Sequence, residues 1–197
     1  MRLLFKIVTS MHTGQKQWVI FISMGLMLFG FVSLTHPTIT DPCDQPLLPQ
    51  GVTEFLAKKF PGWKILRLSD LHPENQRAWL DSEHRDKCPG VAVGNFETKE
   101  HFSYAVALIP LDRDKPSFQL VVVNKVKESY QHRLLVEPKY PANYYVIYKV
   151  PPGKYSDPER IENVQLSLDG IQMEQFHVGA ILFYWKNGRY HRLIVDD

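Results

Sequence analysis

The chain has 197 residues, enough for one domain and hardly for two. Hydrophobic residues make up 44% and charged residues 22% of it, as in chains that bury a packed core, so disorder over most of the length is excluded. The formal net charge is +2, and neither the first 50 residues nor the remainder carries a concentrated basic excess, which argues against a nucleic-acid partner.

An uncharged apolar run, WVIFISMGLMLFGFVSL, covers residues 18–34. As a helix it would span about 26 Å, close to the roughly 30 Å of a bilayer's hydrocarbon core. The basic residues before Lys58 all precede the run: Arg2, Lys6 and Lys16. Because positive charge stays on the cytoplasmic side, the pattern predicts a single-pass protein of the bacterial inner membrane. Residues 1–17 are expected in the cytoplasm, and the chain after the run in the periplasm or outside the cell.

Two interpretations of the run stay open, an uncleaved anchor and a signal peptide removed after export. The candidate cleavage junction, FVSLTHPT at residues 31–38, lacks the small side chains of a cleavage site, which favours the anchor. Met11 is an alternative start that would weaken the charge asymmetry without reversing it. The proline-rich residues 35–50 are expected to form a stiff, extended spacer before an extracytoplasmic domain over residues 51–197.

Two cysteines lie beyond the apolar run, Cys43 in the expected spacer and Cys88 in the expected domain. On the outer side of the membrane disulfides persist, so we expect a bridge that ties the spacer to the domain. Closing a loop of about 45 residues would contribute roughly 3–4 kcal/mol to stability. Free thiols, or a bond to another chain, are the alternatives.

The residues after position 50 predict an α+β domain with two helices first and a mainly antiparallel sheet afterwards. Apolar periodicity predicts helices over residues 52–60 and 73–85. Strands are expected over residues 91–96, 102–110, 118–127, 132–136, 144–150, 178–185 and 189–195. Asn187-Gly188 between the last two apolar runs is typical of a tight hairpin turn, since both residues tolerate positive φ angles.

Residues 88–109, CPGVAVGNFETKEHFSYAVALI, resemble a degenerate FG-GAP-type segment, in which a loop between two strands binds calcium. With PGW at residues 61–63 and YWKNGRYHRLIVDD at the end, the chain is similar to small uncharacterised bacterial exported or membrane-anchored proteins with one such hairpin. The resemblance places Asn95, Glu97, Lys99 and Ser103 at ligand positions. Lys99 puts an ammonium group where a ligand should be, and Ser103 offers only a weak neutral oxygen. The hairpin is therefore expected to keep its shape without binding metal.

The sequence contains no G-x-S-x-G elbow, H-E-x-x-H, phosphate loop or C-x-x-C, so we predict no catalytic residue and no cofactor. Aromatic residues crowd the second half, and exposed Tyr and Trp favour contact with another surface. The candidate binding face consists of Tyr144, Tyr148, Tyr184 and Tyr190, with core packing as the alternative. The leading hypothesis is a membrane-tethered module that binds a protein partner in the bacterial envelope. A periplasmic inhibitor or immunity protein and a hydrolase with a dispersed active site are the alternatives.

Overall fold

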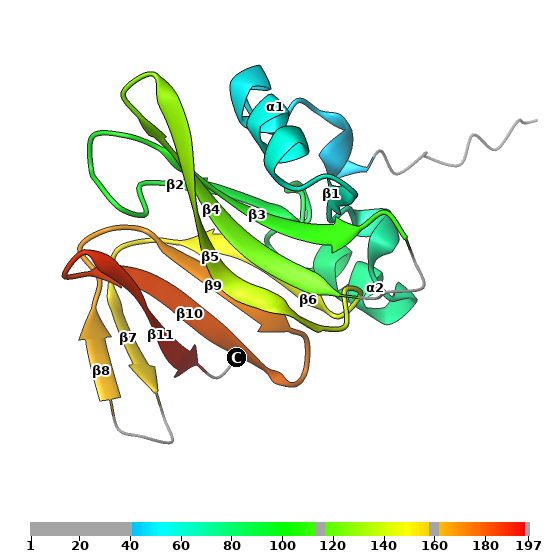
Figure 1. Cartoon of the computed structure of the whole chain (residues 1–197). Helices are drawn as coiled ribbons and strands as arrows, with labels where there is room; N and C mark the ends of the chain where they lie inside the picture. The colour runs from blue at the N-terminus through cyan, green and yellow to red at the C-terminus, as the bar shows by residue number, and fades with distance from the viewer. Residues whose placement is uncertain (1–40, 113–116, 158–161, 196–197) are drawn as a thin grey trace, which may run out of the picture. The chain divides into compact units, whose positions relative to one another are not determined.

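Two antiparallel sheets contain most of the described strands in the computed structural model (Figure 1). The description covers residues 41–112, 117–157 and 162–195. The predicted membrane segment, residues 18–34, lies outside these ranges, and within them no helix has the length and apolar character of a membrane span.

The first sheet, sheet A, is built around β3. Its strands are β1 (Trp63–Ile65), β2 (Val91–Gly94), β3 (Ser103–Pro110), β4 (Phe118–Val126) and β5 (Ser129–Tyr140). One edge of β3 pairs with β2 over residues 103–106 and with β1 over residues 108–110. The other edge pairs with β4, which in turn pairs with β5.

The second sheet, sheet B, has the strand order β11-β10-β9-β6. Its strands are β6 (Tyr145–Val150), β9 (Gly170–Gln175), β10 (Gly179–Lys186) and β11 (Arg189–Val195). The Ile147 N–H donates to the Pro89 carbonyl, 2.8 Å away, and so joins β6 to the residues just before β2. A separate hairpin, β7 (Lys154–Asp157) with β8 (Glu162–Gln165), follows β6.

The main core lies between the two sheets. Because successive side chains of a strand point to opposite faces, alternate residues of β3 and β4 enter this core. They are Ala105, Ala107, Leu120 and Val122, and they meet Ile171, Met173 and Phe183 of sheet B. Helix α2 (Pro73–Asp81) adds Trp79, which is fully buried.

The other face of sheet A is covered by helix α1 (Gln50–Lys59), whose Val52 and Leu56 are buried. They pack in a second core with the remaining residues of the central strands: Val106, Leu108, Val121 and Val123. Strands β3 and β4 are therefore buried on both faces, which explains why their sequences are continuous apolar runs.

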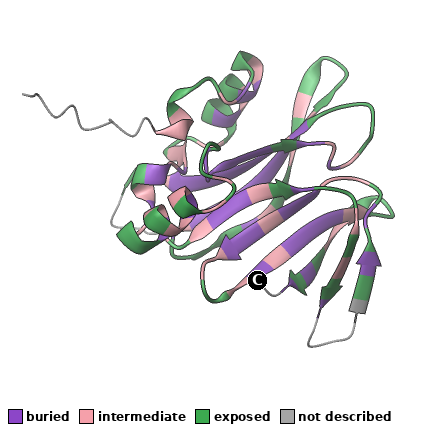
Figure 2. Cartoon of the chain, turned by 180° about the vertical axis from the view of Figure 1, so that it is seen from behind, coloured by how far each residue is buried: buried purple, intermediate pink, exposed green. Residues whose placement is uncertain are grey.

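The β7–β8 hairpin covers part of the outer face of sheet B. Val164 and Leu166 pack there against Leu182, Leu193 and their neighbours in a third core. Figure 2 shows buried residues running along the strands of both sheets, with exposed residues at the loops and helix surfaces. The described chain is thus an α+β domain with two α-helices and antiparallel sheets, as predicted.

Several element bounds differ from the predictions. Helix α2 ends at Asp81 rather than at residue 85, because the Ser82 hydroxyl donates to the Trp79 carbonyl (2.8 Å) and turns the chain. Strand β2 ends at Gly94, and β5 extends over twelve residues instead of five. We did not predict strands β1, β7, β8 and β9.

Residues 41–44 are fixed to the domain. Cys43 and Cys88 form the predicted disulfide. The Arg67 guanidinium pairs with Asp44 and, at 3.4 Å, with Asp41.

These contacts change the interpretation of the spacer, which we predicted as extended over residues 35–50. In its described part, residues 41–50, the chain instead contains a 3-10 helix (Pro42–Asp44) and a buried Leu48. Helix α1 already begins at Gln50. This part of the chain packs on the domain because the disulfide and the Arg67 ion pairs hold it there.

Candidate functional site: the loop end of the sandwich

Four connections gather at one end of the two sheets, which we name the loop end (Figure 1). They are the β2–β3 loop (95–102), the β6–β7 turn (151–153), the β8–β9 loop (166–169) and the β10–β11 turn (187–188). Residues 41–44 lie on the opposite side, next to β1 and α1 (Figure 1). The loop end is therefore separate from the point where the described chain begins.

Asn95 holds the β2–β3 loop in shape. Its side-chain amide donates to the carbonyls of Lys99 (3.1 Å) and His101 (3.2 Å). Its backbone N–H donates to Asp169 Oδ2 at 2.8 Å, and the Lys149 ammonium lies 3.9 Å from the same oxygen. A loop of sheet A is thereby pinned to a loop of sheet B, which gives the loop end a fixed shape.

Arg133 of β5 is the centre of a second cluster. Its Nε lies 3.1 Å from Glu97 Oε1, and its Cζ lies 4.8 Å from the centre of the Trp185 ring. Trp185 in turn meets Tyr190 edge to face, with ring centres 5.0 Å apart. Burial, and secondarily the Glu97 carboxylate, raise the pKa of the Tyr190 hydroxyl far above its usual value, so this hydroxyl stays protonated. The cluster joins the β2–β3 loop, β5 and the β10–β11 hairpin.

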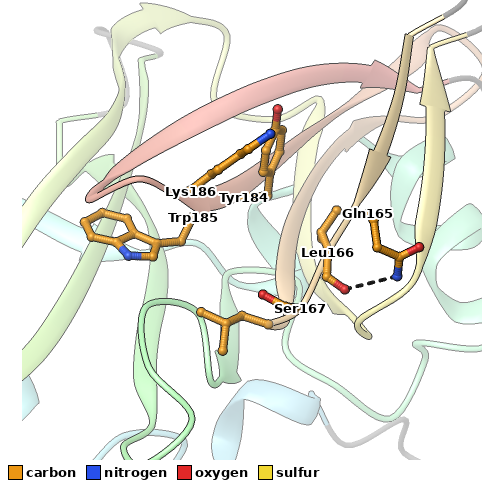
Figure 3. Close-up of a pocket in the computed structure, with 7 residues that line it drawn as sticks. Gln165, Leu166, Ser167, Tyr184, Trp185 and Lys186 are labelled. Atoms are coloured by element: carbon orange, nitrogen blue, oxygen red, sulfur yellow. Dashed lines mark hydrogen bonds between the residues drawn. The ribbon is translucent and has the colours of Figure 1, made fainter.

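A groove runs along the loop end between these clusters. Its first part, about 170 Å³, is lined by Tyr184, Trp185 and Lys186 of β10 on one side and by Gln165 and Leu166 on the other (Figure 3). Its second part, about 310 Å³, reaches Asn95, Lys99 and Asp169. Ser167 and Leu168 line both parts, so the two parts adjoin at these residues.

A wider hollow of about 510 Å³ lies between the β2–β3 loop and the projecting β4–β5 hairpin. Its aromatic side chains are Phe102, which is 62% exposed, Tyr104 and Tyr130. Its charged side chains are Lys125, Lys127 and Glu100. It lies on the face of sheet A that α1 covers, since Tyr104 and Tyr130 pack against the α1 core.

The four residues at the calcium positions do not converge on one point. Asn95 binds carbonyls of its own loop, and Glu97 is paired with Arg133. Ser103 is buried within β3, where it pairs with Gly94 and Asn124, and Lys99 is exposed. Among the described residues, no three His, Cys, Asp or Glu side chains come together as a metal site would require.

The four tyrosines that we predicted as a binding face also lie apart. Tyr184 is buried beneath the β7–β8 hairpin, and Tyr190 belongs to the Arg133 cluster. Tyr144 is 38% exposed and stacks on His72. Only part of this set therefore reaches the loop end, because the strand pleat sends neighbouring aromatic residues to opposite faces.

Tyr148 has a local role between β6, β9 and the residues after α2. Its hydroxyl donates to Glu174 Oε2 at 2.5 Å and accepts from the Gln172 amide at 2.6 Å. Its ring stacks on His84, with ring centres 4.0 Å apart. These contacts hold the Tyr148 side chain against the sheet.

Two histidines lie beside carboxylates, which bears on the hydrolase alternative. His84 Nε2 is 3.6 Å from Glu83, and His72 Nδ1 is 4.0 Å from Glu74. Both carboxylates are largely exposed, at 87% and 79% of their side-chain surface. Such pairs are screened by water and resemble surface ion pairs more than the buried base of a catalytic site.

No family model matches the chain, and no match is found among curated proteins or among solved structures. The FG-GAP resemblance stays a prediction, and the loop end is interpreted from its own geometry. Sequence reasoning did not select Arg133, Trp185 or Lys186 as site residues. The sequence offered little indication of them. Trp185 and Lys186 come just before the predicted hairpin turn, whereas Arg133 contacts Trp185 from a strand that is distant in the sequence.

Proposed function

We propose that residues 41–195 belong to the extracytoplasmic domain of a single-pass envelope protein that binds a protein partner through the loop end. The observation that carries the proposal is the Cys43–Cys88 disulfide, which lies shortly after the apolar run of residues 18–34. Disulfides persist in oxidising compartments and are rare in the cytosol. A tether attached at residues 41–44 would leave the loop end accessible.

The composition of the loop end supports a role in binding. Arg, Trp and Tyr are the residues that most often dominate protein interfaces, and Arg133, Trp185 and Tyr190 lie together there. Arg133 is half exposed, with 50% of its side-chain surface accessible. The cluster is held by two sheets rather than by a free loop, so little ordering would be needed on binding.

The compartment is tested with reporters fused after Asp197 in the full chain. Alkaline phosphatase, which needs disulfides, is expected to be active there, and a cytoplasmic fluorescent reporter is expected to be dark. The opposite pattern would reject the extracytoplasmic location. Non-reducing electrophoresis of the same cells checks that the Cys43–Cys88 bond forms.

Binding is tested by placing a photo-crosslinking residue at Lys186 of the full chain in living cells. We expect one adduct of defined mass, which mass spectrometry identifies. Arg77 on α2 is the matched control, because it is also an exposed basic residue but lies away from the loop end. Equal adducts at both positions, or none at Lys186, would contradict binding at the loop end.

A further inference from the structure

We infer that the loop end binds an acidic, extended segment of its protein partner, in the groove between Lys186 and Lys99. This inference rests on the proposed function and specifies the chemistry of the partner. Three features support it: the exposure of the ion pairs, the distribution of the other charges and the shape of the groove.

The ion pairs of the loop end present their cations to solvent. In the Arg133–Glu97 pair, 50% of the arginine side chain but 12% of the glutamate side chain is exposed. In the Lys149–Asp169 pair the corresponding fractions are 45% and 11%. A partner approaching this surface therefore meets the basic member of each pair, while the acidic member lies beneath it.

Further basic side chains surround these pairs. Besides Arg133 and Lys149 of the pairs, the exposed basic residues of the loop end are Lys99, Lys186 and Arg189. The exposed acidic residue of the same connections is Glu100. The basic residues are spread over ninety positions of the sequence, so the sequence shows no basic run. The fold brings them together, and clustered charge of one sign favours a partner of the opposite sign.

The groove fits a single extended chain. Lys186 lines its first part and Lys99 its second, so carboxylates spaced along a segment could meet an ammonium group in each part. Leu168 and Trp185 line the groove and offer apolar contact between the two lysines. The Ser167 hydroxyl and the Gln165 amide can bond the segment's backbone. This combination of aromatic, apolar and cationic groups favours a peptide over a lipid headgroup or a nucleic acid.

The test uses the full chain in uncharged detergent and fluorescein-labelled poly-L-glutamate, which is extended at neutral pH because its charges repel. We expect saturable binding by fluorescence anisotropy. The double variant Lys99→Glu/Lys186→Glu is expected to weaken this binding at least about tenfold. The matched control, Arg77→Glu/Arg85→Glu, changes the net charge equally on the α2 side and is expected to bind as the parent does.

Three outcomes would overturn the inference. The first is equal loss of binding in both double variants, which would mean attraction by net charge alone. The second is tighter binding of phosphatidylglycerol vesicles or duplex DNA than of poly-L-glutamate. The third is no binding of poly-L-glutamate. If the Lys186 adduct still forms in cells, any of these outcomes leaves the proposed function standing and rejects only the acidic segment.

Discussion

At the scale of single residues, Gly90 carries a tight steric constraint, because two chain segments cross there. Its carbonyl accepts from the Ala107 N–H, and the Leu66 N–H donates to the Ala107 carbonyl, each at 2.9 Å. A Cβ on Gly90 would collide with the Leu66 carbonyl oxygen and lie 2.9 Å from its carbon. The backbones can approach this closely only where no side chain intervenes.

We therefore expect Gly90→Ala to lower the free energy of unfolding by about 3 kcal/mol, since backbone must move to admit the methyl group. Thermal and urea unfolding of the detergent-solubilised full chain measure this. Gly153→Ala is the matched control, because its nearest neighbour would lie 3.5 Å from the new Cβ. A Gly90→Ala variant as stable as the control would contradict the steric argument.

His84 is expected to make stability depend on pH. Burial, and secondarily the charge of Lys87, lower its pKa below the usual 6.5, although Glu83 acts in the opposite direction. As the pH falls through 6.5, His84 takes up a proton more readily in the unfolded chain than in the folded one. The contribution of neutral His84 to stability is therefore fully present above this pH and declines below it.

Between pH 8 and pH 5, the free energy of unfolding should accordingly decrease less in the His84→Gln variant than in the parent. Urea unfolding at several pH values measures the slope. The exposed Gln131→Ala variant, which removes no titratable group, should retain the parent's slope. An unchanged slope in His84→Gln would show that other groups carry the pH dependence.

At the scale of elements, the β7–β8 hairpin acts as a cover for sheet B. Leu166, which directly follows β8, is 4% exposed and packs in the third core with Leu182. We expect Leu166→Ala to cost about 2–5 kcal/mol of stability, because it removes buried apolar atoms and leaves a cavity. Leu134→Ala on β5, where the side chain is 47% exposed, should cost well under 1 kcal/mol. A loss of well under 1 kcal/mol in Leu166→Ala as well would mean that the packing of the hairpin contributes little.

Some strands could be predicted from their sequences, and others could not. Strands β3, β4 and β10 were predicted because their apolar runs are long and bounded by polar turns. Strand β11 was predicted because Asn187-Gly188 is typical of a hairpin turn. Strands β7 and β8 are four residues each and mostly polar, so no periodicity marks them. Strand β9 did carry a signal, since Ile171 and Met173 enter the core while Gln172 and Glu174 alternate with them. Most of the loop end could not be predicted, because it joins residues from separate strands through tertiary contacts.

At the scale of the whole molecule, the disulfide links the first described residues to the core. Its cysteines are 45 residues apart, and on the loop-entropy account such a bond stabilises the folded state by about 4 kcal/mol. A reducing agent should therefore lower the thermal midpoint of the full chain markedly. The double variant Cys43→Ala/Cys88→Ala should already have the lower midpoint and should not respond to the reductant. A parent protein indifferent to reductant would contradict this account.

The same bond also sets the path of mechanical tension through the molecule. Force applied to the chain before Cys43 is transmitted through the disulfide to Cys88. The residues between the two cysteines, which include α1, β1 and α2, therefore bear no load while the bond is intact. An oxidised molecule stretched between its two ends should thus release roughly 150 Å less contour length than a reduced one, at about 3.5 Å per residue. Helix α1 would bear force only after the disulfide is reduced.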